Sequence, residues 1–226
     1  METRNIDTIN YDSEIFNSGH ESFLFECDDG IFKYFFESIP DRFLERKVKI
    51  LNYLAKIEEL KPYHPELKYL VEEWNIIVGY VMSKRNGIPI DSSPYSIAQR
   101  IELLNKGLDI VRLYNKHDIL FLDLHPNLKV DSKSNEVFLV DNDGATTEGV
   151  LTYCGPKNFR NYIQNGGKID QQAQNFFFNQ YTLEVLKNNR KLFNQKGHAI
   201  ITNLQEFKVD SSADHEILLN YVKKDI

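Results

Sequence analysis

The hydrophobic pattern changes its period along the chain, and this change limits the possible fold more than any other feature. Over residues 14–36 and 69–82, apolar and aromatic residues form short or alternating runs that are typical of β-strands. Over 96–117 and 170–187 they recur at the three- and four-residue spacing of buried helix faces. Strands followed mostly by helices predict the α+β class with segregated elements.

Turn residues divide the first part into strands. An Asp-Gly turn at 28–30 lies between two β-prone runs, which is a strong signal for a hairpin, and an earlier turn near 17–20 adds a strand before it. We therefore expect three antiparallel strands. Pro40-Asp41 then begins a helix with apolar residues at helical spacing, and two further strands are expected at 69–74 and 76–82, joined closely at Asn75.

In the second part, a long amphipathic helix is expected from residue 96 to 117. An apolar strand at 119–122 follows, then a turn at 131–135 and a strand at 137–140. A buried helix at 170–187 and a terminal helix at 214–224 complete the expected order.

Length and composition narrow the class of protein. A chain of 226 residues with 42% hydrophobic residues can bury a core, and a net charge of -6 disfavours nucleic acid or an anionic membrane as the main partner. Cys27 and Cys154 are far apart, which predicts neither a disulfide framework nor a zinc site and suits a reducing compartment. The polar first residues and the lack of an apolar run of about 20 residues predict a cytoplasmic protein that does not enter the membrane. The sequence does not specify an oligomeric state.

Two aspartates stand where chemistry is expected. Asp123 and Asp141 each follow an apolar strand, and a short hairpin can bring both carboxylates to one place. Phosphoryl transfer needs such a pair, with one carboxylate near the acceptor hydroxyl and another holding Mg²⁺ on the phosphates. Taken alone, each aspartate is also explained as a turn-forming residue at the end of a strand.

The runs around these aspartates resemble a known family. Asp-Leu-His-Pro-Asn at 123–127 and Val-Asp-Asn-Asp-Gly at 140–144 resemble the catalytic and metal-binding loops of the protein-kinase-like superfamily, in its small bacterial branches. The resemblance implies a catalytic role for Asp123 and Mg²⁺ coordination by Asn127 and Asp141. It leaves Asp143 as a helper or as a cap of the loop. His125 is interpreted as a structural residue of the loop.

The same resemblance assigns residues upstream. Gly19 corresponds to a glycine of the loop that covers the phosphates, and Lys33 to the lysine that pairs with the α- and β-phosphates. Lys33 alone is equally explained as an edge-strand residue that aids solubility. Glu45 is the expected carboxylate partner of Lys33, although another alignment of the helix puts Lys47 at that position. The main chain that meets the adenine corresponds to Val81, Met82 and Ser83.

The resemblance implies a bilobal kinase-like fold. Residues 1–84 would form a nucleotide-binding lobe with an antiparallel sheet and one helix, and residues 85–226 a mainly helical lobe with the catalytic and metal-binding loops. The implied activity is an ATP- and Mg²⁺-dependent transfer of the γ-phosphate to a hydroxyl, with protein serine or threonine as the leading acceptor. Two alternatives stay open: a kinase of small molecules such as aminoglycosides or choline-like alcohols, and a pseudokinase that binds nucleotide or protein without turnover.

Overall fold

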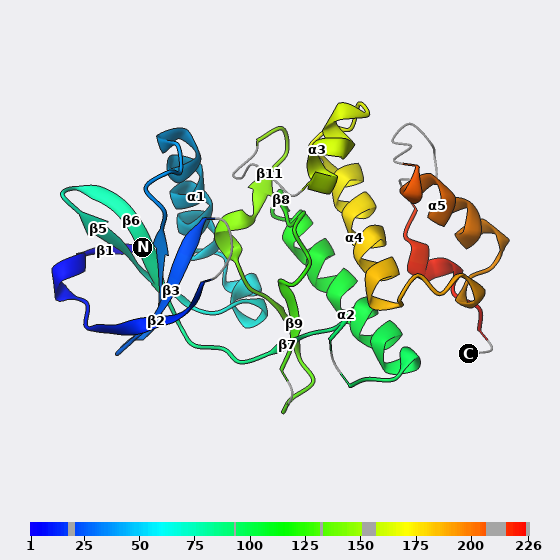
Figure 1. Ribbon diagram of the computed structural model, residues 1–226, viewed down its shortest axis with the longest axis horizontal. Coiled ribbons are helices and arrows are strands. Elements are labelled where there is room, and N and C mark those ends of the chain that lie inside the picture. Colours follow the sequence, from blue (N-terminus) through cyan, green and yellow to red (C-terminus); the bar gives the residue numbers. More distant parts are fainter. Residues whose placement is uncertain (18–20, 93, 132, 151–156, 207–215, 225–226) are drawn as a thin grey trace. The chain divides into compact units, whose positions relative to one another are not determined.

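A computed structural model describes residues 1–17, 21–92, 94–131, 133–150, 157–206 and 216–224 of the chain. The chain divides into two units, Met1–Asn86 and Gly87–Ile226. Strands dominate the first unit and helices the second (Figure 1). The α+β class expected from the change in hydrophobic period is therefore confirmed.

The first unit is built on a six-stranded sheet with the strand order β1-β5-β6-β4-β3-β2. Neighbouring strands are antiparallel except β1 and β5, which are parallel. The meander β2-β3-β4 and the hairpin β5-β6 confirm the expected strands, whereas β1 was not expected. The strands are β1 (Glu2–Asn5), β2 (Tyr11–Asn17), β3 (Ser22–Cys27), β4 (Gly30–Phe35), β5 (Leu67–Glu73) and β6 (Ile76–Met82).

Local sequence explains the two tight turns of this sheet. Gly30 has a φ of 142°, and a Cβ atom there would lie 2.2 Å from the carbonyl oxygen of Met82, so only glycine allows β4 to approach β6 this closely. Trp74 and Asn75 both have positive φ, at 53° and 63°, as the two-residue turn of a twisted hairpin requires.

One helix belongs to the first unit. α1 (Asp41–Leu54) begins after Pro40, whose fixed φ suits the start of a helix, and it buries Lys47, Ile50, Leu51 and Leu54. The 3-10 helix η1 (Ile6–Thr8) lies between β1 and β2, and η2 (Glu58–Tyr63) lies between α1 and β5. The first unit also has a hydrophobic core cluster of buried side chains, which consists of Ile9, Phe32, Tyr69, Val71 and Val81.

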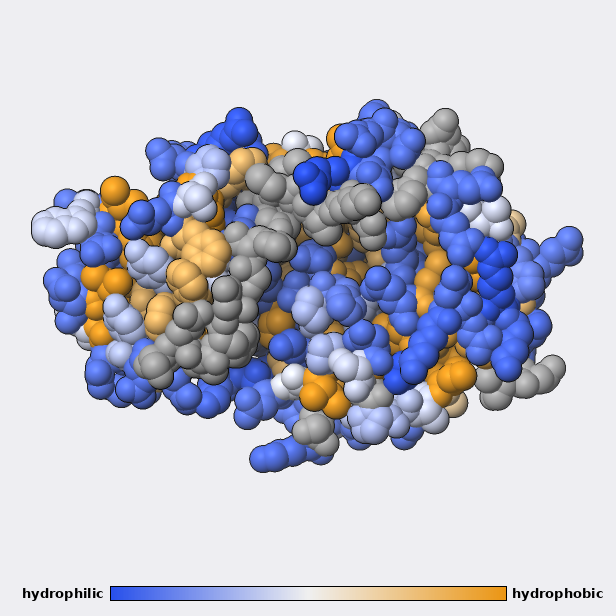
Figure 2. Space-filling model, viewed as in Figure 1, coloured by the Kyte–Doolittle hydropathy of each residue, from blue (hydrophilic) through white to orange (hydrophobic). Residues whose placement is uncertain are grey.

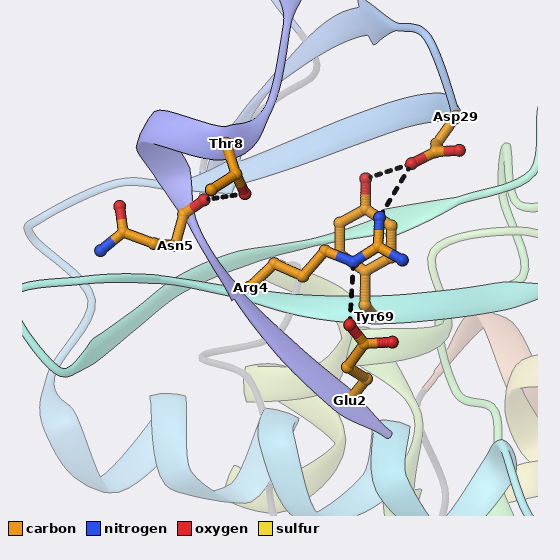
Figure 3. A network of polar contacts seen from close by, with 6 residues as sticks. All are labelled: Glu2, Arg4, Asn5, Thr8, Asp29 and Tyr69. Atoms are coloured by element: carbon orange, nitrogen blue, oxygen red, sulfur yellow. Dashed lines mark hydrogen bonds and ion pairs between the residues drawn. The ribbon is translucent and has the colours of Figure 1, made fainter.

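Polar contacts fasten β1 to the sheet (Figure 3). The Arg4 guanidinium lies 3.9 Å from the centre of the Tyr69 ring and forms ion pairs with Glu2 and Asp29 at 3.1 and 3.2 Å. The Tyr69 hydroxyl donates to the Asp29 carboxylate at 2.8 Å. Burial, together with this hydrogen bond and the charge of Asp29, raises the pKa of Tyr69 to about 12.

The second unit is mainly helical and contains short strands. β9 pairs with both β10 and β7, and β11 pairs with β8, all antiparallel. The strands are β7 (Ile88–Pro89), β8 (Ile119–Leu120), β9 (Leu128–Val130), β10 (Val137–Leu139) and β11 (Thr146–Thr147). The helices are α2 (Ile97–Asn115), α3 (Lys157–Gln164), α4 (Gln171–Val185) and α5 (Gln195–Gln205), with 3-10 turns η3 (Asn142–Gly144), η4 (Arg190–Leu192) and η6 (Leu218–Tyr221).

Helix boundaries in this unit follow capping chemistry. Ser96 caps α2 in a reciprocal capping box with Gln99, and Asp170 caps α4 by accepting hydrogen bonds from the main chain of Gln172 and Ala173. The expected terminal helix at 214–224 is wrong over its described part, 216–224. That segment contains only the short turn η6, because Ile217 and Val222 on either side of it are extended, and Val222 forms an antiparallel bridge with Phe193.

The surface carries no broad apolar area on the face shown in Figure 2, where hydrophobic residues form small, separate patches among hydrophilic ones. Large hydrophobic side chains that are exposed include Trp74 and Ile76, on either side of Asn75 at the β5-β6 turn. Within the described ranges, no helix has the length and hydropathy needed to cross a bilayer.

Candidate functional site

The loop between β8 and β9 carries Asp123 and Asn127. Its main chain turns tightly, because the Leu128 N–H donates to the Leu124 carbonyl at 2.8 Å. The Asn127 side chain is buried, and its Nδ2 donates to the Asp123 carbonyl at 2.9 Å. The Asn127 side chain is therefore fixed to the main chain at Asp123 through its amide nitrogen.

The β9-β10 hairpin brings Asn127 next to Asp141. Leu128 stands opposite Leu139 in the ladder, and the pairing continues where the Val140 N–H donates to the Asn127 carbonyl at 3.0 Å. Asp141 is the next residue, so the predicted pair of metal ligands is brought together. The expected turn at 131–135 joins β9 to β10, and in it the Asn135 N–H donates to the Asp131 carbonyl at 2.9 Å.

Asp141 has a backbone conformation that aspartate seldom adopts. Its φ of 63° and ψ of 44° place it in the left-handed region, and the Gly144 N–H closes the following turn onto its carbonyl at 2.9 Å. Non-glycine residues in this region are uncommon and cluster at functional sites. The conformation turns the chain sharply at the end of β10 and leaves Asp141 partly exposed while Asn142 and Asp143 are buried.

The electrostatics around Asp141 include a nearby cation. Partial burial lowers the pKa of Lys129 on β9, and the negative charge of Asp141 opposes that shift. Among the described residues, no group of three or more histidine, cysteine, aspartate or glutamate side chains could hold a metal ion. One carboxylate and one amide oxygen suit Mg²⁺, which keeps several waters and shares its remaining positions with phosphates.

His125 binds another loop of the second unit. Its Nε2 lies 3.0 Å from Asp91 Oδ2, and the second carboxylate oxygen of Asp91 is buried without a hydrogen bond. The His125 ring also lies 6.4 Å from the ring of Tyr181 on α4. These contacts agree with the structural interpretation of His125. Sequence reasoning missed Asp91, because a lone aspartate 34 residues away gives no signal of this pairing.

Lys33 lies in the interior of the first unit's sheet. β4 has β3 and β6 as neighbours, and Lys33 pairs with Leu24 on one side and Tyr80 on the other. The alternative of an edge-strand residue is therefore wrong. Only 6% of Lys33 is exposed, and buried lysines are rare unless they are paired or functional. At Gly79 of β6, a Cβ atom would lie 2.1 Å from the Lys33 carbonyl oxygen.

The structure does not join Glu45 to Lys33. Glu45 is exposed on α1, and no ion pair links the two side chains within the described residues. Lys47, the alternative register, is on the buried face with 1% exposure, and its Nζ lies 2.8 Å from Glu21 Oε2. The reason is helical phase: Lys47 precedes the buried Ile50 and Leu51 by three and four residues, whereas Glu45 does not.

The remaining predicted nucleotide contacts lie at the end of β6. Val81 and Met82 are buried in the sheet, where Met82 has partners on both β4 and β5. The Ser83 N–H donates to the Glu66 carbonyl at 2.8 Å, so that donor is already used within the unit. An adenine would therefore have to bind other main-chain groups of this segment. Gly19 lies outside the described residues.

Comparison of the chain with protein-family models found no match, and a search of curated proteins found none either. The functional argument therefore depends on the geometry above and on the residues that the sequence singled out.

Proposed function

We propose that the chain is a kinase-like phosphotransferase, which uses ATP and Mg²⁺ to move the γ-phosphate to a hydroxyl group. The observation that carries the proposal is a chain of two hydrogen bonds, from Asn127 Nδ2 to the Asp123 carbonyl and from the Val140 N–H to the Asn127 carbonyl. These bonds link the main chain at Asp123 to Asn127, and Asn127 to Val140, the residue directly before Asp141.

Each residue has a role that suits its surroundings. Asn127 and Asp141 would hold Mg²⁺ against the β- and γ-phosphates, and the metal supplies charge neutralisation. Asp123 would orient the acceptor hydroxyl and accept its proton as the new bond to phosphorus forms and ADP leaves. Lys33, which is buried in the sheet of the first unit, would neutralise the α- and β-phosphates.

Protein serine or threonine is the proposed acceptor. This is the acceptor that the resemblance favours; after α4, the described residues contain α5 and short 3-10 turns. A small-molecule kinase stays the alternative within the same chemistry. Two observations favour a pseudokinase. The Ser83 N–H, expected to meet the adenine, already donates to the Glu66 carbonyl, and Glu45, expected to pair with Lys33, is exposed.

The test is phosphoryl transfer by the full chain and by Asp123→Asn. Intact mass after incubation with Mg-ATP, and label transfer from γ-labelled ATP to casein, report protein acceptors. We expect Asp123→Asn to lose about 100-fold or more in transfer, in the range for removal of a general base, while a fluorescent ATP analogue still binds.

Asp109→Asn is the matched control, because it removes the same charge from an exposed position on α2. It should transfer phosphate like the wild type. Undiminished transfer by Asp123→Asn would show that the catalytic assignment is wrong, and transfer to small alcohols but not to protein would select the small-molecule alternative.

A further inference from the structure

A buried glutamine on α4 holds the main chain directly before Asp123. Gln174 has no exposed surface. Its Oε1 accepts a hydrogen bond from the Phe121 N–H at 2.5 Å, and its Nε2 donates to the Phe121 carbonyl at 2.7 Å. One side chain thus satisfies both main-chain groups of a residue 53 positions away.

These two bonds supply partners for main-chain groups that lie beyond the end of the β8-β11 ladder. β8 pairs with β11 only at Ile119 and Leu120, and the ladder ends before Phe121. Phe121 is itself buried, so its N–H and C=O groups need partners there. The primary amide of Gln174 has the donor and acceptor of a peptide group, and so it can satisfy both main-chain groups of Phe121.

Helix α4 contacts the Asp123 loop at two places, through Gln174 near its start and through Tyr181 two turns later. The Asp170 cap fixes the start of the helix one turn before Gln174. At the other end of the loop, the Tyr181 hydroxyl donates to the Leu128 carbonyl at 3.3 Å. α4 therefore contacts the main chain on both sides of Asp123 and Asn127.

We propose that Gln174 is a positioning residue for Asp123: by fixing the main chain at Phe121, it sets where the Asp123 carboxylate stands. This inference depends on the proposed phosphotransfer for its effect on rate. Without the two bonds, the main chain at Phe121, two residues before Asp123, loses the contacts that fix it to α4. A displacement of about 1 Å can lower a rate by about 100-fold.

The same helix offers a matched control. Asn179 is equally buried, its Nδ2 donates to the Glu216 carbonyl at 2.7 Å, and its Oδ1 accepts from the Leu218 N–H at 2.9 Å. It holds the main chain near η6 instead of the Asp123 loop. Gln174→Met and Asn179→Leu therefore each remove two hydrogen bonds between a buried side-chain amide and a main chain, at different places.

The experiment compares the two variants of the full chain by steady-state kinetics and by hydrogen exchange. We expect Gln174→Met to lower kcat by about 100-fold with little change in the KM for ATP, and to speed amide exchange over 121–123. Asn179→Leu should keep kcat and speed exchange near Leu218 instead. If Gln174→Met fails to fold, Gln174→Glu, which keeps an acceptor for the Phe121 N–H, is measured against the same control.

Two results would overturn the inference: unchanged exchange over 121–123 in the Gln174 variant, or an equal loss of kcat in both variants. If the wild type itself transfers no phosphate, the proposed function fails, and the exchange comparison alone decides whether Gln174 holds the loop.

Discussion

At the scale of single residues, Asn142 is a polar side chain in a buried position that leaves its hydrogen-bonding groups unsatisfied. The side chain is fully buried between Asp141 and Asp143, and neither its Nδ2 nor its Oδ1 has a hydrogen-bond partner. An unsatisfied buried amide costs about 1–3 kcal/mol, and leucine has the same number of side-chain heavy atoms. We expect Asn142→Leu to raise the free energy of unfolding, measured by urea denaturation, by an amount within that range, and so to raise the urea midpoint.

Asn115 gives a parallel case, because both atoms of its amide are also buried and unpaired, at the end of α2. Asn115→Leu should stabilise the protein in the same way. A lower midpoint for Asn142→Leu alone would show that its amide binds a partner, such as an ordered water, that the leucine displaces.

His64 makes the first unit sensitive to acid. Burial lowers the pKa of His64 below its ordinary value of 6.5, opposed by a contact between Nδ1 and the Pro65 carbonyl and helped by the charges of Arg85 and Lys61. The unfolded chain thus binds the proton more readily than the folded one. Stability is full above pH 6.5 and is lost as the pH falls below it, toward the folded-state pKa.

We expect the urea midpoint of the wild type to fall between about pH 7.5 and pH 5.5, and to fall less in His64→Gln, which stays neutral. His198→Gln changes an exposed histidine on α5 and should keep the wild-type fall. The same fall in His64→Gln as in the wild type would refute this assignment.

Which residues the sequence could reveal depends on how local their signals are. Asp123, Asn127 and Asp141 stand in short runs that resemble the loops of a known family, and the structure links Asn127 to Asp123 and to the residue directly before Asp141. Gln174 and Asp91 act through contacts 53 and 34 residues away, and nothing beside them in the sequence indicates it.

At the scale of elements, helix α2 supports the site through one close contact. Gly107 is buried on α2, and a Cβ atom there would lie 2.6 Å from Cδ2 of Leu128, which directly follows Asn127. Alanine would gain about 1 kcal/mol of helix propensity, but overpacking a full core costs about 1–3 kcal/mol. We expect Gly107→Ala to lower the melting temperature, because Leu128 has no exposed surface into which it can move.

Asn105→Ala is the control on the same helix, since residue 105 is exposed and gains propensity without overpacking. It should leave the melting temperature unchanged or raise it. A melting temperature of Gly107→Ala at or above the wild-type value would show that β9 yields easily, contrary to a rigid support for Asn127.

Elements with a strong period were predictable and those without one were not. α1 and α2 keep apolar residues at helical spacing, and the β3-β4 and β9-β10 turns carry Asp-Gly or Asp and Asn residues. β1 has four exposed residues and no alternation, so only its pairing with β5 and the contacts of Arg4 define it. The helix expected at 214–224 failed over its described part because Val222 is extended and pairs with Phe193, a distant contact that the local apolar pattern does not reveal.

At the scale of the whole molecule, the residues proposed for one reaction are divided between two units. Lys33 belongs to the first unit, and Asp123, Asn127 and Asp141 to the second. Each unit positions its own residues by its own main-chain pairing, which is why each set could be described separately. Nucleotide binding by either set can be tested through the stability of the full chain and of variants in each unit.

A ligand that binds only the folded state stabilises it by about 2.7 kcal/mol at 100 times its Kd, which corresponds to roughly 5–10 °C in a protein of this size. We expect such a shift with ATP and Mg²⁺, and a smaller one when EDTA removes the metal. Asp141→Asn should lose the metal-dependent part, Lys33→Met should weaken both parts, and Asp109→Asn should behave as the wild type. A shift that ignores Mg²⁺ would favour the pseudokinase, and no shift in any condition would remove nucleotide binding from the proposal.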